Sequence, residues 1–336
     1  MKLKNSVAAI ACASAIFGSA QAVTAGGHLD EITVAYFLEW PMPFQFAKVN
    51  GTYEEAMGLK INWVSFDTGT AMSAAMASGD VQIAVSQGVP PFVVATSAGQ
   101  DLQIVDVAVS YADNDNCVVA EALEIDKMSA GELAGKKVGV PIGTAAHYGF
   151  LKQMEHFDVD ITTMEIVDMA PPDGAAAFAQ GNLDMVCGWG GALRRMKEHG
   201  NVLLTGAEKT DLGLLVFDVT SAPAEFVAEE GELLTKFLQV TADANTMWNG
   251  GEMRDEMLAV IAKDAGMDVE ATAETIDTFV FPDVDTQLSG AWLGGNAQTF
   301  MKGVAEVFVN AGSIPAALDS YEGAVDTSPL SAASGM

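Results

Sequence analysis

The chain has 336 residues, half of them hydrophobic, and carries 45 acidic against 16 basic residues, which gives a formal net charge of −29. A surface this acidic repels nucleic acid and anionic lipid, so nucleic-acid partners are excluded. The length and the apolar content favour two lobes over a single domain.

The amino terminus has the pattern of a cleaved signal peptide. Lys2 and Lys4 precede the uncharged stretch "SVAAIACASAIFG", and the small-residue site "AQA" ends at residue 22. The apolar run is too short to span a bilayer, so we expect residues 1–22 to be removed during secretion. Cleavage leaves only Cys117 and Cys187, and their spacing does not decide between a disulfide and two buried thiols.

The next segments alternate between strands and helices. An alternating, β-branched run is typical of a strand, and a run of small residues ended by Gly79 is typical of a short helix. The sequence predicts strands at 31–37, 60–66 and 81–85, with helices at 44–49 and 71–78. Strand, loop, helix and strand in this order indicate a parallel sheet with right-handed crossovers.

The same pattern returns about a hundred residues later. "ASGDVQIAVSQGVP" begins at Ala77, and "AQGNLDMVCGWGG" begins at Ala179. When Gly79 is aligned with Gly181, Gln87 aligns with Trp189. Strands are predicted at 136–141, 164–169 and 183–188, with a loop and a helix over 142–157 and a helix at 175–180. The chain therefore holds two similar α/β lobes, and the carboxyl-terminal edges of their sheets face each other across a cleft.

The last third is mainly helical. A strand at 214–220 is followed by predicted helices at 222–248, 252–266, 269–279 and 297–312, and by a loose polar tail at 326–336. No new βαβ unit occurs, so this part is expected to pack back onto the first lobe. Lobe 1 would then comprise residues 29–113 plus 219–330, and lobe 2 residues 114–218. Two crossings between the lobes form a hinge.

Helix amino termini at the cleft are suited to an anion. Four of them carry small or hydroxyl residues: Gly69-Thr70, Gln87-Gly88, Gly143-Thr144-Ala145 and Asp173-Gly174. Free amides and the positive end of a helix dipole bind an anion without a basic side chain. None of the three arginines lies at a predicted strand end. Each loop by itself is better explained by helix capping, so their convergence carries the prediction.

Residues suited to a cation lie on the same loops. Glu39 and Asp218 stand at or near strand ends, where a carboxylate can accept charge-assisted hydrogen bonds from an ammonium. Trp40, Tyr148 and Trp189 can cover a cation or an alkyl chain with their rings. Trp63 and Trp248 fall within predicted elements and are expected in the core.

Catalytic and metal motifs are not evident. Only His147 of the four histidines lies near the cleft, and no zinc-ligand spacing, Gly-x-Ser-x-Gly elbow, phosphate loop or dinucleotide fingerprint occurs. We therefore expect no cofactor, no metal and no enzymatic activity. A thiolate pair of His147 with Cys187 is the catalytic alternative.

Several stretches resemble a known family when they are taken together. They are "TVAYFLEWP", "FDTGTAMSAAMASGDVQIAVSQGVPPFVVA", "GKKVGVPIGTAAHY", "MEIVDMAPPDGAAAFAQGNLDMVCGW" and "LLVFDV". In this order they resemble the nitrate, sulfonate and taurine solute-binding proteins of bacterial ABC importers, in particular the taurine-binding ones. The resemblance implies a two-lobed periplasmic-binding-protein fold of type II, with two crossovers. It also implies a periplasmic monomer that serves a membrane permease and its ATPase.

The resemblance also assigns roles to residues. The family's sulfonate contacts fall on Gln87, Gly88, Thr144, Ala145 and His147. Its amine-binding acid falls on Asp218. The chain departs from the family in having Gln87-Gly88-Val89 where a serine pair is usual, and alanines at 145 and 146 where hydroxyl residues are common.

These observations lead to one preferred function and two alternatives. The preferred hypothesis is capture of a small zwitterion, taurine or a related aminoalkanesulfonate, by Glu39, Trp40, Thr70, Tyr148, Trp189 and the residues named in the preceding paragraph. A methylated zwitterion such as a betaine is an alternative within the same class. An enzyme related to thiamine-precursor synthesis is the alternative from another class.

Overall fold

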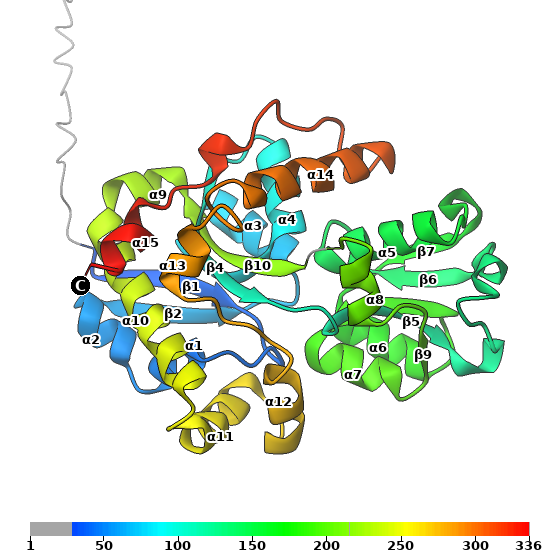
Figure 1. Ribbon diagram of the computed structural model, residues 1–336, viewed down its shortest axis with the longest axis horizontal. Helices are drawn as coiled ribbons and strands as arrows, with labels where there is room; N and C mark the ends of the chain where they lie inside the picture. The colour runs from blue at the N-terminus through cyan, green and yellow to red at the C-terminus, as the bar shows by residue number, and fades with distance from the viewer. Residues whose placement is uncertain (1–28, 215, 336) are drawn as a thin grey trace, which may run out of the picture.

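The computed structural model describes residues 29–214 and 216–335, so the expected leader at 1–22 lies outside the described residues. Two α/β lobes lie side by side, each built on one five-stranded sheet (Figure 1). The first sheet contains β1 (Glu31–Tyr36), β2 (Lys60–Ser65), β3 (Ile83–Gly88), β4 (Leu102–Ser110) and β10 (Phe217–Pro223). The second contains β5 (Asp115–Ala120), β6 (Lys137–Val140), β7 (Glu165–Asp168), β8 (Met185–Trp189) and β9 (Gly200–Val202).

The two sheets have the same topology. Their strand orders are β2-β1-β3-β10-β4 and β7-β6-β8-β5-β9. In each sheet the first three strands are parallel, and the fourth is antiparallel to both of its neighbours. The repeated sequence pattern therefore corresponds to a repeated unit of structure. Gly79 and Gly181 occupy equivalent left-handed positions, with φ of 81° and 73°, between a helix and the third parallel strand.

Helices cover both faces of each sheet (Figure 1). The first lobe carries α1 (Phe44–Val49), α2 (Thr52–Met57), α3 (Gly69–Ala77), α4 (Val89–Ser97), α9 (Ala224–Glu229), α10 (Gly231–Gly250), α11 (Arg254–Ala265), α12 (Val269–Ile276), α13 (Val284–Leu288), α14 (Asn296–Asn310) and α15 (Ser328–Ala333). The second carries α5 (Ala145–His156), α6 (Pro171–Ala179), α7 (Gly190–Lys197) and α8 (Gly206–Asp211). None of the described helices has the length and apolar composition needed to cross a bilayer.

Two crossings join the lobes. The chain leaves the first sheet after Ser110 and enters the second at Asp115, and it returns to the first sheet at Phe217. Phe217 and Asp218 pair with Ser110 and Val109, so both lie in the first sheet rather than at the end of the second lobe. The sequence pattern did not indicate β4, because this strand is buried along most of its length and shows no polar alternation.

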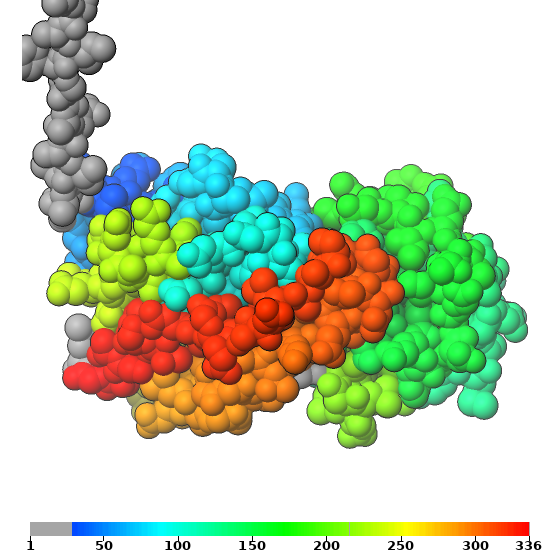
Figure 2. All heavy atoms as spheres, turned by 90° about the horizontal axis from the view of Figure 1, so that it is seen from above, coloured from blue at the N-terminus to red at the C-terminus, as the bar shows by residue number. Residues whose placement is uncertain are grey.

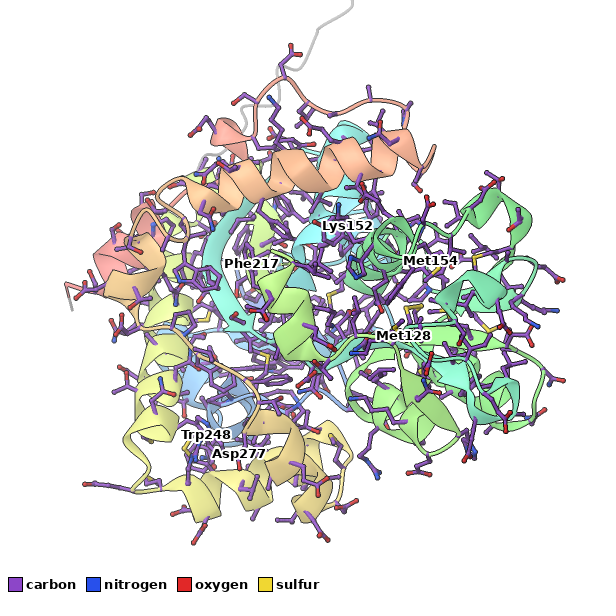
Figure 3. The ribbon with its side chains drawn as sticks, turned by 45° about the vertical axis from the view of Figure 1, so that its right-hand side comes forward. Met128, Lys152, Met154, Phe217, Trp248 and Asp277 are labelled. Carbon is purple, nitrogen blue, oxygen red and sulfur yellow. A yellow bond between two sulfur atoms is a disulfide. The ribbon has the colours of Figure 1, made fainter. Side chains whose placement is uncertain are left out.

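The carboxyl-terminal helices pack on the first lobe. α14 reaches from there toward the second lobe (Figure 2), and its residues contact both α4 and α5. Trp248 in α10 is buried, as expected for a core residue. The Arg254 guanidinium lies 4.5 Å from its ring centre and 3.5 Å from the Asp277 carboxylate (Figure 3).

The predicted loose tail is instead partly helical. Residues 328–333 form α15, which packs against α10. Pro329 is at the start of the helix, where a missing N–H costs nothing, and Leu330 and Ala333 are buried on one face. The prediction was wrong because the composition of the tail is polar while its few apolar side chains share one helical face.

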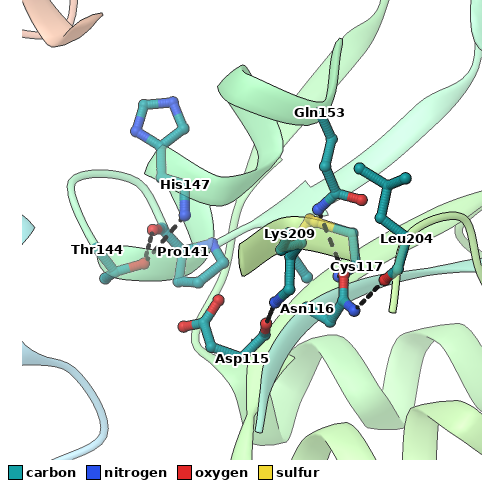
Figure 4. Close-up of a disulfide and its surroundings, with 10 residues drawn as sticks. Asp115, Asn116, Cys117, Pro141, Thr144, His147, Gln153, Leu204 and Lys209 are labelled. Carbon is teal, nitrogen blue, oxygen red and sulfur yellow. Dashed lines mark hydrogen bonds between the residues drawn. A yellow bond between two sulfur atoms is a disulfide. The ribbon is translucent and has the colours of Figure 1, made fainter. Parts of the chain in front are cut away.

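A disulfide joins two strands of the second sheet. Cys117 of β5 lies directly opposite Cys187 of β8 in the antiparallel register, and their sulfur atoms are bonded (Figure 4). Both residues are buried. The disulfide that the sequence left undecided is therefore formed. The sulfur of Cys187 is engaged in this bond, whereas a catalytic pair with His147 would need it as a free thiol.

Replacement of both cysteines by alanine is expected to lower the free energy of unfolding by about 2–5 kcal/mol. The reason is that the bond closes a loop with a sequence separation of 70, which restricts the unfolded chain. Denaturant titration of the oxidised protein and the double variant measures the difference. Reduced wild-type protein is the matched control and should resemble the variant. Equal midpoints for the oxidised protein and the variant would contradict the expectation.

Candidate functional site

A small cavity lies between the lobes. The residues that line it come from strand ends, helix amino termini and the first crossing: Phe37, Trp40, Gly69, Gly88, Pro91, Tyr111, Asp115, Thr144, Ala145, Trp189 and Asp218. Both lobes contribute, at the carboxyl ends of parallel strands, where ligands bind in open α/β sheets. No lysine or arginine is among these lining residues. Among the described residues, no cluster of three or more His, Cys, Asp or Glu is placed to hold a metal.

The cavity contains the buried carboxylate of Asp218. Ser86 donates its hydroxyl to Oδ2 at 2.7 Å, and Tyr111 donates its hydroxyl to Oδ1 at 2.8 Å. The Trp40 indole N–H in turn donates to the Ser86 hydroxyl at 2.9 Å. Burial raises the pKa of Asp218 to about 7, and these hydrogen bonds only partly oppose the shift. The site therefore presents a carboxylate that gains much from a cationic partner.

Ser86 takes an unusual backbone conformation to make these contacts. Its φ is 61°, in the left-handed region that non-glycine residues rarely occupy. The register between β3 and β10 shifts at Val219 and Ser221 beside it. A strained backbone conformation persists where neighbouring groups hold it in place. Here the hydrogen bonds of the Ser86 hydroxyl with the Trp40 and Asp218 side chains hold it.

Asp115 is a second buried carboxylate in the same cavity. It starts β5 on the second lobe, and its Oδ2 atom is buried without a hydrogen-bond partner in the described structure. The Lys209 ammonium donates to the main-chain oxygen of Asp115 and not to its carboxylate (Figure 4). Burial raises the pKa of Asp115 to about 7, with the positive charge of Lys209 opposing the shift.

Aromatic rings form a wall of the cavity. Trp40 packs against Tyr111 with ring centres 4.9 Å apart, and also against Phe279 at 4.5 Å. Phe37 of the first lobe meets Trp189 of the second at 5.9 Å. Such faces suit an alkyl chain or a cation.

Two helix amino termini, one from each lobe, also line the cavity and approach each other across the cleft. Gly69 begins α3 on the first lobe, and Ala145 begins α5 on the second. A methyl group on Gly143 would lie 3.2 Å from the Thr70 side chain, so the two helix starts are close. The first amides of a helix have no intrahelical partner, so both helices offer donors to an anion.

α4 is a weaker donor because Pro90 and Pro91 occupy its first turn and lack N–H groups. Thr144 also offers little, since its hydroxyl donates to the Pro141 carbonyl at 2.6 Å (Figure 4). The amides of Gly69 and Ala145 are therefore better placed to meet an anion than the loop at Gly88.

A family model described as NMT1/THI5 like matches residues 41–248. The chain belongs to the NMT1/THI5-like family. It is 25% identical over 297 residues to the taurine-binding periplasmic protein of Escherichia coli strain K12, across 86% of this chain and 89% of that protein. The likeness to this taurine-binding protein agrees with the resemblance in the sequence motifs.

Solved structures share the fold. The periplasmic aliphatic sulphonate binding protein SsuA of Escherichia coli matches with a TM-score of 0.68 and 22% identity, over 87% of this chain and 91% of that one. The alkanesulfonate-binding protein SsuA of Xanthomonas axonopodis pv. citri, bound to MOPS, matches with a TM-score of 0.71 and 17% identity, over 86% and 96%. The two-lobed α/β architecture expected from the sequence is therefore confirmed.

Six of the residues that the sequence and the family resemblance predict for the site lie together on the cavity lining: Trp40, Gly88, Thr144, Ala145, Trp189 and Asp218. The other five are Glu39, Thr70, Gln87, His147 and Tyr148, and none is among the lining residues.

Gln87 is fully buried beneath the cleft. Its amide nitrogen donates to the Gly69 carbonyl at 3.0 Å and to the Ser73 hydroxyl at 2.6 Å. Its amide oxygen accepts from Ser221 at 2.6 Å. The side chain thus joins β3 to α3 and β10, and it has no free group directed at the cavity. Thr70 lies at the start of α3, and its hydroxyl shares a hydrogen bond with Thr68 at 3.0 Å.

His147 and Tyr148 pack against α14 instead of lining the cavity. The His147 ring stacks on Phe308 with centres 5.2 Å apart, and its Nδ1 accepts from the Gly143 amide at 3.2 Å. Burial lowers the pKa of His147 to about 4, although the charge of Asp168 opposes this, so the ring is neutral at physiological pH. Tyr148 meets Phe300 edge-on at 5.8 Å.

Glu39 is engaged by an arginine of the other lobe. Arg195 of α7 donates to both of its carboxylate oxygens, at 2.5 and 3.0 Å. This ion pair borders a second, larger cavity that shares Phe37 and Trp189 with the first one. Glu39 therefore links the lobes at the cleft mouth, and its carboxylate is not free to take an ammonium as the sequence suggested.

Sequence reasoning missed four lining residues: Phe37, Pro91, Tyr111 and Asp115. Tyr111 and Asp115 lie in a stretch that the sequence identified only as a crossing. The segments that connect two lobes pass the base of the cleft between them. Their position in the chain was therefore the sequence signal that could have identified Tyr111 and Asp115.

Gly190 allows the close approach of the lobes. It has a φ of 56°, and a Cβ there would lie 2.5 Å from the main-chain oxygen of Glu39. The adjacent Gly191 amide donates to that same oxygen at 3.2 Å. The closed arrangement therefore requires a residue without a side chain at position 190.

Gly190→Ala is expected to weaken binding of a cleft ligand at least about tenfold, since a backbone clash of this size costs well over 1 kcal/mol in the closed state. Calorimetry with taurine as titrant and small-angle X-ray scattering for compaction measure the effect. Gly181→Ala is the matched control, because it also has positive φ but nothing within 4 Å of an added Cβ. Equal affinities for the two variants would contradict the role of Gly190 in closure.

Proposed function

We propose that this chain is the periplasmic solute-binding component of an ABC importer, which captures taurine or a closely related aminoalkanesulfonate between its lobes and delivers it to a permease. The observation that carries the proposal is that one small cavity holds groups suited to both charges of a zwitterion. Asp218 offers a buried carboxylate, and α3 and α5 begin at lining residues Gly69 and Ala145, where helix amides lack intrahelical partners. The names of the periplasmic taurine-binding relative and of the sulfonate-binding structures support this assignment.

In this proposal the ligand lies along the cavity. Its sulfonate accepts hydrogen bonds from the amides near Gly69 and Ala145, because a permanently ionised group needs fixed donors and no proton transfer. Its ammonium meets Asp218. The short alkyl chain lies against Trp40 and Trp189. Gly88 leaves room for the ligand beside Asp218, because a side chain at position 88 would occupy that space, with its Cβ 3.5 Å from the Oδ1 atom of Asp218.

Ligand contacts from both lobes would favour the closed form. The energy available for closure equals the difference between the ligand's contacts in the closed and open states. Glu39 and Arg195 add a partly exposed ion pair to the closed form, which contributes about 0.2–1 kcal/mol. The permease would then recognise the closed shape.

Calorimetric titration tests the proposed function directly. Taurine is expected to bind the protein without residues 1–22 with a dissociation constant far below 1 mM. Asp218→Asn is expected to weaken binding about 10–100-fold, because a charge-assisted hydrogen bond is lost. Asp285→Asn, an exposed site on α13, is the matched control and should bind as the wild type does. Millimolar or weaker binding of taurine and its close analogues would refute the assignment.

Affinity for taurine is expected to rise as the pH increases through about 7. Because the pKa of Asp218 is raised to about 7, the free protein below this pH holds a proton that the ammonium must displace. The loss approaches tenfold per pH unit for one group. Titrations at pH 5.5 and 8, in buffers of different ionisation enthalpy, measure both the affinity and the released protons. Equal affinity at the two pH values would contradict this expectation.

The aromatic wall favours one second candidate, a methylated zwitterion. Trp40, Tyr111 and Trp189 present ring surface near Asp218, and such surfaces bind quaternary ammonium groups in other proteins. Competition between taurine and glycine betaine in the same titration separates these ligands. Tighter binding of glycine betaine would replace taurine as the proposed ligand.

A further inference from the structure

The cavity contains one carboxylate from each lobe. Asp218 lies on β10 of the first sheet, and Asp115 begins β5 of the second. Both line the same small cavity. They are therefore brought together by the closed arrangement of the lobes, and no single lobe places both at the site.

The two carboxylates differ in their hydrogen bonds. Asp218 accepts from two hydroxyl groups, whereas the buried Oδ2 of Asp115 has no partner in the described structure. No described lysine or arginine lies within 4 Å of the Asp115 carboxylate, although Lys209 binds the main-chain oxygen of the same residue. A buried acceptor without a donor is costly, so Asp115 lacks a group that a ligand can supply.

Like charges in one buried space oppose closure of the empty cleft. The charge of Asp115 adds to burial in raising the pKa of Asp218, and both carboxylates raise the pKa of the nearby Tyr111. Lys209 is the other charged group that acts on Asp115. A cation between the two carboxylates would convert their repulsion into attraction for both lobes.

We propose that Asp115 and Asp218 form a two-carboxylate gate, in which an ammonium bearing N–H groups must bind between the lobes before they close. The proposal rests on the proposed function for the anionic end of the ligand. It restricts the ligand class to aminoalkanesulfonates with an unmethylated ammonium. A simple alkanesulfonate carries no cation, so the two carboxylates would still repel each other when it is bound. A quaternary ammonium has no N–H group, so the Asp115 carboxylate would still lack a hydrogen-bond donor.

Ligand selectivity of the wild-type protein and Asp115→Asn tests the gate. Taurine is expected to bind the wild type at least about 100-fold tighter than ethanesulfonate, and at least about tenfold tighter than N,N,N-trimethyltaurine. In Asp115→Asn, taurine should bind more weakly and ethanesulfonate more tightly, so that the first ratio falls at least about tenfold. Asp285→Asn should keep the wild-type ratios. An unchanged ratio in Asp115→Asn, or a wild type that does not prefer taurine to ethanesulfonate, overturns the gate.

A ligand-free measurement separates this proposal from the proposed function. Small-angle scattering at pH 8 should show Asp115→Asn to be more compact than the wild type, because one repelling charge is gone, and the difference should vanish at pH 5, where carboxylates with raised pKa values are protonated. Equal radii of gyration at pH 8 overturn the gate. If no sulfonate binds the wild type, the proposed function fails, and this scattering comparison still decides the gate. If Asp115→Asn does not fold, the wild-type ligand ratios decide it.

Discussion

The organisation of the cleft depends on the burial of the Asp218 carboxylate. A carboxylate removed from water must find hydrogen-bond donors, and here the donors come from different parts of the chain. Ser86 lies within β3, and Tyr111 lies in the crossing between the lobes. Trp40 follows β1 and donates to Ser86. One buried charge thus fixes the relative positions of three segments that line the cleft.

The two lobes are built alike, but their loops differ in chemistry. Both sheets place three parallel strand ends at the cleft, with an antiparallel strand beside them. Gln87 of the first lobe and Trp189 of the second occupy equivalent positions. The Gln87 side chain makes hydrogen bonds within its own lobe, whereas Trp189 lines the cavity. A repeated backbone arrangement therefore supplies the shape of the site, and single residues at strand ends supply its polarity.

Contacts between the lobes surround the cavity on more than one side. The Glu39–Arg195 pair lies at the mouth, and His147 and Phe308 stack where α5 meets α14. The helix α14 belongs to a part of the chain that does not repeat, yet it completes the enclosure. His147, which the family resemblance assigns to the ligand, instead packs between the lobes.

The sequence by itself determined the parallel strands of both lobes, the two-lobed fold and the segments that bring Trp40, Thr144, Trp189 and Asp218 to one edge, but not β4 or α15. These follow from local periodicity and from the rule that parallel strand ends share an edge. The tertiary structure alone decided which side chains are free. Glu39 meets an arginine 156 residues away, and Gln87 meets Ser221 134 residues away. Asp115 gained its place only through the crossing of the chain between lobes. Local propensity describes the backbone, whereas the availability of a polar group depends on neighbours that are distant in sequence.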